Sequence, residues 1–523
     1  MAEVIEQLKK ILLSIGLFSR LVVRVPLRGY QLGPANAVID SCLRQRGLEF
    51  LWVFPRQSGK DEAVAQLVVF LLVLFHRLEA CIVHVYPTGG QLATGVTRLE
   101  HRLENAWFKG RWWSKSKPIR RGLGSAMCAF FSGHPQAKAE GATANLLLIV
   151  NEAQDQHEAT VERRFTPMRA STNATALYVG TVRTTSDYLW RIKARLEKLE
   201  VEDGVKRVFV VSAVEAGLEC PAYIKFVENQ VRLKGRHHPT VKTEYFNEPV
   251  DVAAGLFPER RRALMRGRHK RLRTPDEGEL YLALIDVGGQ DEAATSAFAE
   301  LTNPGRDYII CTIVRVKRDP ELVGPKYEAV EVQSWQGIRH FQDVPGQLSL
   351  FNQLMTMLRV WSPQAVIVDF TGVGQGITDA LIAGYKRNVF GFTFTASNKA
   401  RLGNDFLAVI ETGRFQYFHN PREISEVGHG DEWLFFLQCE RCGYELAEGV
   451  PIERGLRWGV PATAKYQDER TGETLLVHDD RLISAALVAE ADRLYREGEL
   501  FLSTGESAVI RRDIMGEIDA GEW

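Results

Sequence analysis

The chain has 523 residues, of which 45% are hydrophobic and 25% charged, which is the composition of a globular protein with two or three domains. Its 65 basic and 65 acidic residues cancel, so the overall charge gives no argument for a nucleic-acid partner. Seven scattered cysteines indicate a reducing compartment and exclude a disulfide framework. We expect no secretion signal, because acids precede the first apolar run, and the longest apolar run, 67–75, is too short for a bilayer span. We therefore expect an intracellular, soluble protein.

Two strand-rich regions are predicted in chain order. The first has apolar strands separated by helical stretches, which favours an open, mostly parallel sheet. Its strands are 49–54, 81–87, 146–150 and 176–181. The second region has strands at 280–289, 307–317, 365–370 and 389–394. A dense basic run, 255–273, separates the two regions. We predict an α/β domain over 1–254, a basic linker over 255–278, a second α/β domain over 279–495 and a tail over 496–523.

The first strand leads into PRQSGK (55–60), and a predicted helix follows. A strand, a glycine-containing loop and a helix N-terminus together point backbone N–H groups at an anion. Gln57, Ser58 and Gly59 would supply those groups, and Lys60 would add a charge for the β- and γ-phosphates of ATP. By its letters alone the stretch could also be an ordinary surface turn.

Further residues strengthen the ATP-site interpretation. The strand 146–150 leads into Asn151 and then Glu152, a position from which a carboxylate could activate the attacking water. Thr181 follows another buried strand, where a hydroxyl could sense the γ-phosphate. Tyr30 and Gln31 precede the loop, as expected for a ring that stacks on adenine and a side-chain amide that recognises the base. Taken alone, Glu152 is also compatible with a simple helix-start carboxylate.

Two residues of this region depart from the usual pattern. Asp61 stands where a hydroxyl normally holds Mg²⁺, and Asn151 stands where a carboxylate is usual. Our hypothesis is that Asp61 supplies the anionic Mg²⁺ contact that Asn151 cannot. The alternative is that Asp61 only favours the helix N-terminus.

The second region contains a set of acids at strand or helix ends. Asp286 and Asp369 each close an apolar strand, and Asp480 begins a helix. Such carboxylates could hold two divalent metals about 4 Å apart for phosphodiester hydrolysis, and oxygen ligands suit Mg²⁺ or Mn²⁺. Asp291 and Asp479 are secondary candidates for metal ligands. Strand-end Asp is commonly a cap or turn residue, so the metal-site interpretation depends on the three acids together and not on any one of them.

Three other features remain open on the sequence. Lys399 is a candidate for a phosphate contact or a solvated lysine. Cys439 and Cys442 have the spacing of half a zinc site, but no second pair lies nearby in the sequence. The basic run 255–273 could line a DNA path or form a solvated face.

Together these motifs resemble the large terminase subunit of tailed double-stranded DNA bacteriophages, in that family's order and over nearly the whole chain. They are YQ (30–31), PRQSGK (55–60), EGATANLLLIVNEAQD (140–155), YVGT (178–181), EYFNE (244–248), LIDVGGQDEAA (284–294), VIVDFTGVG (366–374) and HDDRLISAAL (478–487). The resemblance implies an N-terminal P-loop ATPase of the ASCE type and a C-terminal RNase H-like nuclease. It also implies that Lys60 binds phosphate, Glu152 activates water, Thr181 couples hydrolysis to movement and Arg56 contacts the nucleotide phosphates.

The resemblance further implies a motor that drives double-stranded DNA into a procapsid and cuts concatemeric DNA. Its implied partners are DNA, the portal protein and a small terminase subunit, with a homo-oligomer, expected to be a pentamer, only on the portal. Its implied location is the host bacterial cytoplasm and, transiently, the procapsid. The trans-acting arginine of such motors has four candidates, Arg98, Arg102, Arg120 and Arg121. One alternative is a DNA-repair helicase-nuclease, which usually has a second motor domain with helicase motifs that the stretch after 185 does not show. The other is a degenerate prophage copy that only binds DNA or the portal.

Overall fold

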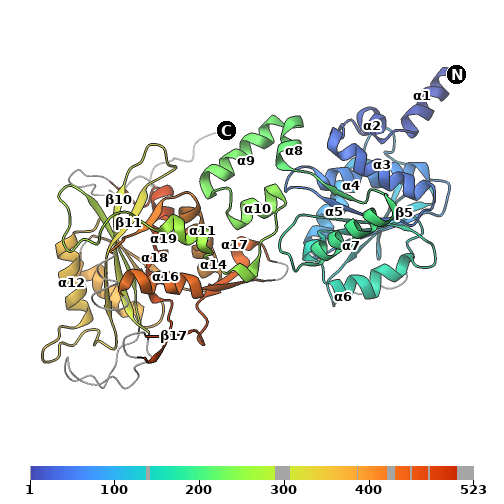
Figure 1. Cartoon of the computed structure of the whole chain (residues 1–523). Helices are drawn as coiled ribbons and strands as arrows, with labels where there is room; N and C mark the ends of the chain where they lie inside the picture. The colour runs from blue at the N-terminus through green and yellow to red at the C-terminus, as the bar shows by residue number, and fades with distance from the viewer. Residues whose placement is uncertain are drawn as a thin grey trace. The chain divides into compact units, whose positions relative to one another are not determined.

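The computed structural model describes residues 2–136, 142–288, 307–385, 387–420, 430–447, 450–468 and 472–502. They divide into two compact units, which are described separately below (Figure 1). The first unit is Met1–Val252 together with Ala447–Ile452, and the second is Ala253–Leu446 together with Glu453–Trp523. Asp291 lies outside the described residues.

The first unit is built on an eight-stranded sheet. Six of its strands, in the spatial order β5, β2, β6, β7, β1 and β8, pair only in parallel with one another. This confirms the predicted mostly parallel sheet. A meander of three antiparallel strands, β3 to β5, extends one edge and was not predicted. In spatial order the strands are β3 Trp112–Ser116, β4 Ile119–Leu123, β5 Ala126–Ser132, β2 Cys81–Tyr86, β6 Leu147–Asn151, β7 Thr175–Gly180, β1 Glu49–Val53 and β8 Val208–Val210.

Both faces of this sheet are buried. Alternate residues of β1 point to opposite faces, so Phe50 and Trp52 join one apolar core and Leu51 and Val53 join another. The core around Phe50 contains residues of α3, α4 and α5, and the core around Leu51 contains residues of α7. The helices of this unit are α1 Ala2–Leu12, α2 Ile15–Phe18, α3 Gly29–Leu43, α4 Lys60–Leu74, α5 Gly89–Leu103, α6 Glu158–Thr160, α7 Tyr188–Asp203, α8 Ala213–Glu219, α9 Pro221–Lys234 and α10 Pro239–Phe246.

Helix α4 contains most of the apolar run 67–75. Every residue from Ala63 to Leu72 is buried, so the helix is apolar on all sides. Its first residue is Lys60, and the preceding Gly59 has a left-handed φ of 89° that lets the loop turn into the helix. The buried helix therefore holds the loop at the end of β1.

The second unit contains a six-stranded mixed sheet. Strands β9, β10 and β11 form an antiparallel meander, and β12 and β13 extend it in parallel beside β9. This is the strand arrangement of an RNase H-like fold, as predicted. Strands β11 and β14 were not predicted. In spatial order the strands are β13 Asn388–Phe392, β12 Ala365–Asp369, β9 Leu280–Asp286, β10 Ile309–Lys317, β11 Lys326–Trp335 and β14 Phe415–Tyr417.

Helices cover this sheet too. Leu354 and Leu358 of α12 and Ile377 of α13 pack in one core with Ala283 and Ile285 of β9. In chain order the described helices from α11 on are α11 Glu259–Met265, α12 Leu350–Trp361, α13 Gly374–Tyr385, α14 Ala396–Glu411, α16 Asp431–Arg441, α17 Ile452–Gly455, α18 Asp480–Ala486 and α19 Val488–Arg496. Two small hairpins pair β15 Gly443–Leu446 with β16 Leu456–Gly459 and β17 Lys465–Gln467 with β18 Thr474–Leu476.

Helix α18 is anchored to the middle of the sheet. Its Ser484 hydroxyl donates to the carbonyl of Leu284 on β9 at 2.9 Å and lies 2.8 Å from the hydroxyl of Thr312 on β10. These buried contacts hold the start of α18, where Asp480 lies, at the end of β9. Among the described residues, no helix combines the length and the apolar character needed to cross a bilayer.

Candidate functional sites

The loop before α4 is braced from upstream. The Tyr30 hydroxyl donates to the carbonyl of Ser58 at 2.6 Å, and the Gln31 amide donates to the carbonyl of Gly59 at 3.0 Å. Both side chains are almost fully buried, and the Ser58 hydroxyl donates to the carbonyl of Pro55 at 2.7 Å. Tyr30 and Gln31 thus contact the backbone of the loop, and their expected contact with adenine stays a prediction.

Lys60 lies between the two polar residues that follow β6 and β7. Its ammonium group is 2.8 Å from one carboxylate oxygen of Glu152 and 3.0 Å from the other. It also donates to the hydroxyl of Thr181 at 2.9 Å. Glu152 and Thr181 lie 92 and 121 positions after Lys60, and the three residues meet because β1, β6 and β7 are adjacent parallel strands whose carboxyl ends share one edge.

Glu152 is held in an unusual backbone conformation, with φ 47° and ψ 55°. Non-glycine residues in this left-handed region cost on the order of 1–3 kcal/mol and cluster at functional sites. Gln154 supports the carboxylate, because its amide donates to Glu152 at 2.6 Å and accepts from the backbone N–H of Thr181 at 3.1 Å. Burial raises the pKa of Glu152, but Lys60 and Gln154 outweigh it, so the net pKa lies below the usual value. The group is therefore ionised at neutral pH and can accept a proton.

A cavity of about 260 Å³ opens beside these residues. Arg56 lies at its rim, more than half exposed, and pairs with Glu244 at 2.6 Å. On another wall Arg183 pairs with Asp155 at 3.0 Å. The cavity thus combines cationic groups for phosphates with an ionised Glu152, and it fits a polyphosphate at its Lys60 end. Gln57 is exposed, with a positive φ of 61°.

Asp61 and Asn151 lie next to each other, as the compensation hypothesis requires. The Asn151 amide donates to the Asp61 carboxylate at 3.4 Å, and the other Asp61 oxygen is 3.2 Å from Arg98. The side-chain carbonyl of Asn151 is buried and has no hydrogen-bond partner among the described residues. An unsatisfied buried oxygen costs free energy, so this atom suits a metal ion or its bound water. The residues present therefore fit a Mg²⁺ ion, held through Asp61 and Asn151.

The compensation hypothesis leads to a double-mutant prediction. We expect Asp61→Ser to slow ATP hydrolysis and Asn151→Asp to restore much of the loss in the double variant, because each pair keeps one carboxylate beside the metal. The coupling energy from the four rates should be about 0.5–3 kcal/mol, the range for residues in contact. Steady-state phosphate release at saturating ATP and Mg²⁺ measures it, and additive effects of the two substitutions would contradict the hypothesis.

Three of the four arginines considered as trans-acting candidates pair with acids of the same unit. Arg98 pairs with Asp61, Arg102 with Glu62 at 2.9 Å, and Arg121 with Glu100 at 2.7 Å. An arginine that acts on a neighbouring subunit would have to break such a pair, so these contacts do not favour any of the three. Arg120 is half-buried on β4, and its assignment stays open.

In the second unit the predicted acids gather at one end of the sheet. Strands β9 and β12 are parallel with Ile285 opposite Val368, so Asp286 and Asp369 end neighbouring strands at the same level. Helix α18 brings Asp480 to the same place. Asp369 accepts from the backbone N–H of Thr371 at 2.8 Å, which orients its carboxylate.

Burial raises the pKa of all three acids, and neighbouring carboxylates add to this effect for Asp286 and Asp480. Burial, followed by the charges of Asp480 and Asp369, raises the pKa of Asp286 well above its usual value. Burial also raises the pKa of Asp369 and raises that of Asp480 to about 7. Clustered carboxylates with raised pKa values favour a bound cation, because a cation removes the repulsion between them. The residues fit a divalent metal with oxygen ligands.

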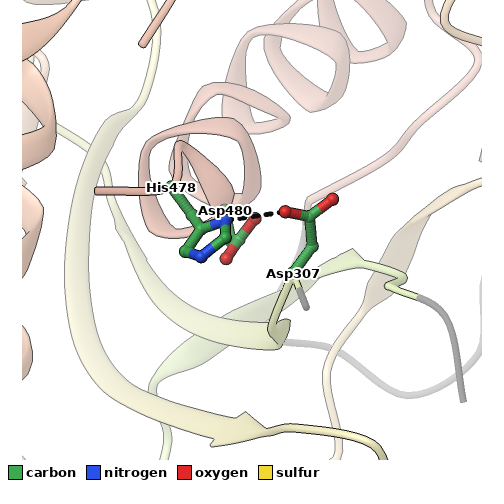
Figure 2. Close-up of side chains that lie close together, drawn as sticks. All are labelled: Asp307, His478 and Asp480. Atoms are coloured by element: carbon green, nitrogen blue, oxygen red, sulfur yellow. Dashed lines mark hydrogen bonds and ion pairs between the residues drawn. The ribbon is translucent and has the colours of Figure 1, made fainter. Parts of the chain in front are cut away.

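Asp307 and His478 join this cluster and were not predicted as ligands (Figure 2). The His478 ring is 2.7 Å from the Asp307 carboxylate, and ligand atoms of Asp307, His478 and Asp480 all lie within 4.8 Å of one another. A hydrogen bond to Asp307 raises the pKa of His478. The sequence places Asp307 at the start of a predicted strand, but only the antiparallel pairing of that strand with β9 brings it to the edge where Asp286 lies.

The remaining candidates have the following positions. Asp479 is 3.7 Å from the ammonium group of Lys399, which also lies over the ring of Trp458 at 5.4 Å. Cys439 and Cys442 are buried, free thiols, and the described residues bring no third metal-ligating group to them. A zinc site at this pair is therefore not supported by the described part of the chain.

The fold and the two sites define an α/β protein with a phosphate-loop cavity in one unit and a carboxylate cluster on an RNase H-like sheet in the other. Among solved structures, the chain is similar to the large terminase of the thermophilic bacteriophage D6E, with TM-score 0.42 and 13% identity over 89% of this chain and 99% of that chain. It is also similar to the HK97 bacteriophage large terminase, with TM-score 0.37 and 11% identity over 92% of this chain and 99% of that chain.

A shorter similarity concerns a nuclease structure. It is the large terminase nuclease from thermophilic phage G20c with bound magnesium, with TM-score 0.29 and 13% identity over 45% of this chain and 96% of that chain. No protein-family model and no curated protein sequence matches the chain.

Proposed function

We propose that this chain is the large terminase subunit of a tailed double-stranded DNA bacteriophage. It hydrolyses ATP to move viral DNA into a procapsid through the portal, and it cuts concatemeric DNA with a metal-dependent endonuclease. One observation carries the proposal: a single chain combines the Lys60–Glu152–Thr181 contact at the edge of a parallel sheet with the carboxylates of Asp286, Asp369 and Asp480 on an RNase H-like sheet.

The ATPase role is supported by the charges around Lys60. Lys60 is positioned to bind the β- and γ-phosphates, and the N–H groups of the loop and Arg56 would contact the same phosphates. Glu152 then accepts a proton from the attacking water, since it is ionised and held by Gln154. Thr181 contacts both Lys60 and the carbonyl of Phe54, so its hydroxyl links the phosphate end of the site to the end of β1.

The nuclease role is supported by the gathering of Asp286, Asp369 and Asp480 in one place, where their raised pKa values mean that a cation would relieve the cost of ionising them. Divalent ions held there would stabilise the attacking and leaving oxygens of a phosphodiester. Asp286, Asp369 and Asp480 would hold Mg²⁺ or Mn²⁺, with Asp479 and Asp291 as secondary ligands. Lys399, next to Asp479, is suited to a phosphate of the same strand.

The proposal includes partners and a location. The partners are double-stranded DNA, the portal protein and the small terminase subunit. The chain works in the host bacterial cytoplasm and, while it packages DNA, on the procapsid, where it forms a homo-oligomer that we propose is a pentamer.

A triplex-displacement experiment tests the motor function. A third strand bound in the major groove of a duplex is displaced when a motor moves along the duplex without opening it. We expect the full chain to displace the third strand in an ATP-dependent manner, and we expect it not to separate the strands of a forked duplex in the same buffer. Gel electrophoresis of labelled strands measures both reactions.

The outcomes separate the alternatives. Separation of the forked duplex would contradict the terminase proposal and favour the helicase-nuclease. A chain that binds DNA but neither hydrolyses ATP nor cuts DNA with Mg²⁺ or Mn²⁺ would favour the degenerate copy.

A further inference from the structure

A polar groove of about 520 Å³ lies in the second unit, beside the segment that follows α11. It lies between this segment, the start of β11 and the edge strand β14. Its polar lining residues are Arg266, Arg268, His269, Lys326, Glu328 and Gln416.

The basic run around α11 divides into two groups when its contacts are examined. One group is neutralised by carboxylates of the same unit: Arg260 and Arg261 pair with Glu411, and Arg271 pairs with Glu331 at 2.6 Å. The other group consists of Arg266, Arg268 and Lys270, which are exposed and form no ion pair with any described residue. Only the second group offers its charge to a ligand, and two of its members line the groove.

The one carboxylate in the groove is already compensated. Glu328 is buried and accepts from Arg315 at 2.8 Å, with Lys317 at 3.3 Å and Lys326 at 3.5 Å. His269 is held by the carbonyl of Ala329, at 2.7 Å from its ring. The groove therefore has an excess of positive charge and suits an extended anion.

The lining favours phosphates over bases. It contains no Phe, Tyr or Trp on which a base could stack, whereas single-strand binding relies on such platforms. Arg266 keeps its guanidinium over the ring of Phe436, at 4.7 Å, which holds the arginine in place but occupies that ring. Gln416 adds a polar group of the kind that contacts phosphates of a duplex.

The groove is separate from the acid cluster. Lys326 of β11 is opposite Lys317 of β10, and the neighbouring Val316 is opposite Leu280 of β9. The groove therefore lies beside the start of β9, whereas Asp286 lies at the end of that strand. A strand of seven residues spans about 20 Å. A ligand in the groove is therefore bound apart from the centre that would cut DNA.

We propose that this groove binds the sugar–phosphate backbone of duplex DNA, outside the cutting centre, through Arg266 and Arg268. Two such contacts provide a hold that does not depend on base sequence. The inference takes DNA as substrate from the proposed function, and it adds the surface that holds the duplex.

Fluorescence anisotropy of a labelled 30-base-pair duplex, titrated with the full chain in EDTA at several salt concentrations, tests the groove. We expect Arg266→Gln/Arg268→Gln to weaken binding about tenfold and to lower the salt slope by about 2, because each lost phosphate contact removes about 0.9 from the slope. The matched control is Arg359→Gln/Arg387→Gln, which removes the same charge from two exposed positions of the same unit, one on α12 and one directly before β13. A second variant, Arg268→Gln/Lys270→Gln, leaves the contact with Phe436 in place.

Each outcome decides the inference. Weaker binding in both groove variants, with unchanged thermal unfolding and little effect of the control, supports it. An equal loss of affinity in the control pair overturns it, and so does an unchanged salt slope in the groove variants. It is also overturned if inorganic phosphate binds in the groove but leaves the affinity for the duplex unchanged. If the wild type binds and cuts duplex DNA while the groove variants bind equally well, the groove is refuted and the proposed function stands. If the wild type neither binds nor cuts duplex DNA, both fail.

Discussion

Glu152→Gln is expected to reduce ATP hydrolysis by about 10²–10⁴-fold, the contribution of a positioned general base, while the chain still binds ATP. The substitution keeps the size of the side chain and its ability to hydrogen-bond to Lys60, but an amide cannot take a proton from water. Phosphate release in the presence of duplex DNA measures the rate, and a fluorescent ATP analogue measures binding.

The control for this variant is Glu62→Gln, which lies in the first turn of the helix that Lys60 begins and is paired with Arg102 outside the cavity. It should hydrolyse ATP at close to the wild-type rate. If Glu152→Gln hydrolysed ATP as fast as this control, Glu152 would not be the base. If it failed to bind ATP, its role would be to position Lys60.

Asp286→Asn should abolish DNA cleavage, with a loss on the order of 10³-fold, because several kcal/mol of transition-state stabilisation depend on the metal ions. ATP hydrolysis should be unaffected, since Asp286 belongs to the other unit. Conversion of supercoiled plasmid to linear DNA with Mg²⁺ or Mn²⁺ measures cleavage. Asp379→Asn, an exposed substitution on α13, is the control.

The same variant should be more stable than the wild type in EDTA at pH 8. In the metal-free fold the raised pKa of Asp286 keeps a proton on the carboxyl that the unfolded chain has already released. Its unfavourable contribution is absent below pH of about 4 and grows as the pH rises toward the raised pKa. The stability gain of Asp286→Asn should therefore shrink at pH 5, and Mg²⁺ at pH 8 should reverse the order by stabilising only the wild type.

Thermal unfolding in these buffers measures the effect. A variant that is stable yet does not cut DNA cannot owe its inactivity to misfolding. Cleavage by Asp286→Asn at the rate of the Asp379→Asn control, or a stability gain that does not depend on pH, would contradict the placement of Asp286 among metal ligands.

The sequence by itself determined the parallel strands and the position of the phosphate loop. Apolar runs such as 146–150 can only be buried, and a polar residue directly after such a run marks the strand's end. Because parallel strands share one edge for their carboxyl ends, the positions of Lys60, Glu152 and Thr181 along the chain were enough to predict that they meet. The same reasoning brought Asp286 and Asp369 together.

Only the tertiary structure decided which side chains neutralise one another. Arg261 is paired with Glu411, whereas Arg268 has no carboxylate partner among the described residues. The basic run itself does not distinguish these two arginines, because Glu411 is 150 positions away from Arg261 in the sequence. Asp307 and His478 likewise meet through the pairing of β10 with β9 and the anchoring of α18. Burial pattern is a property of each segment and is written in its sequence, whereas the pairing of charges depends on distances between segments, and those distances exist only in the folded chain.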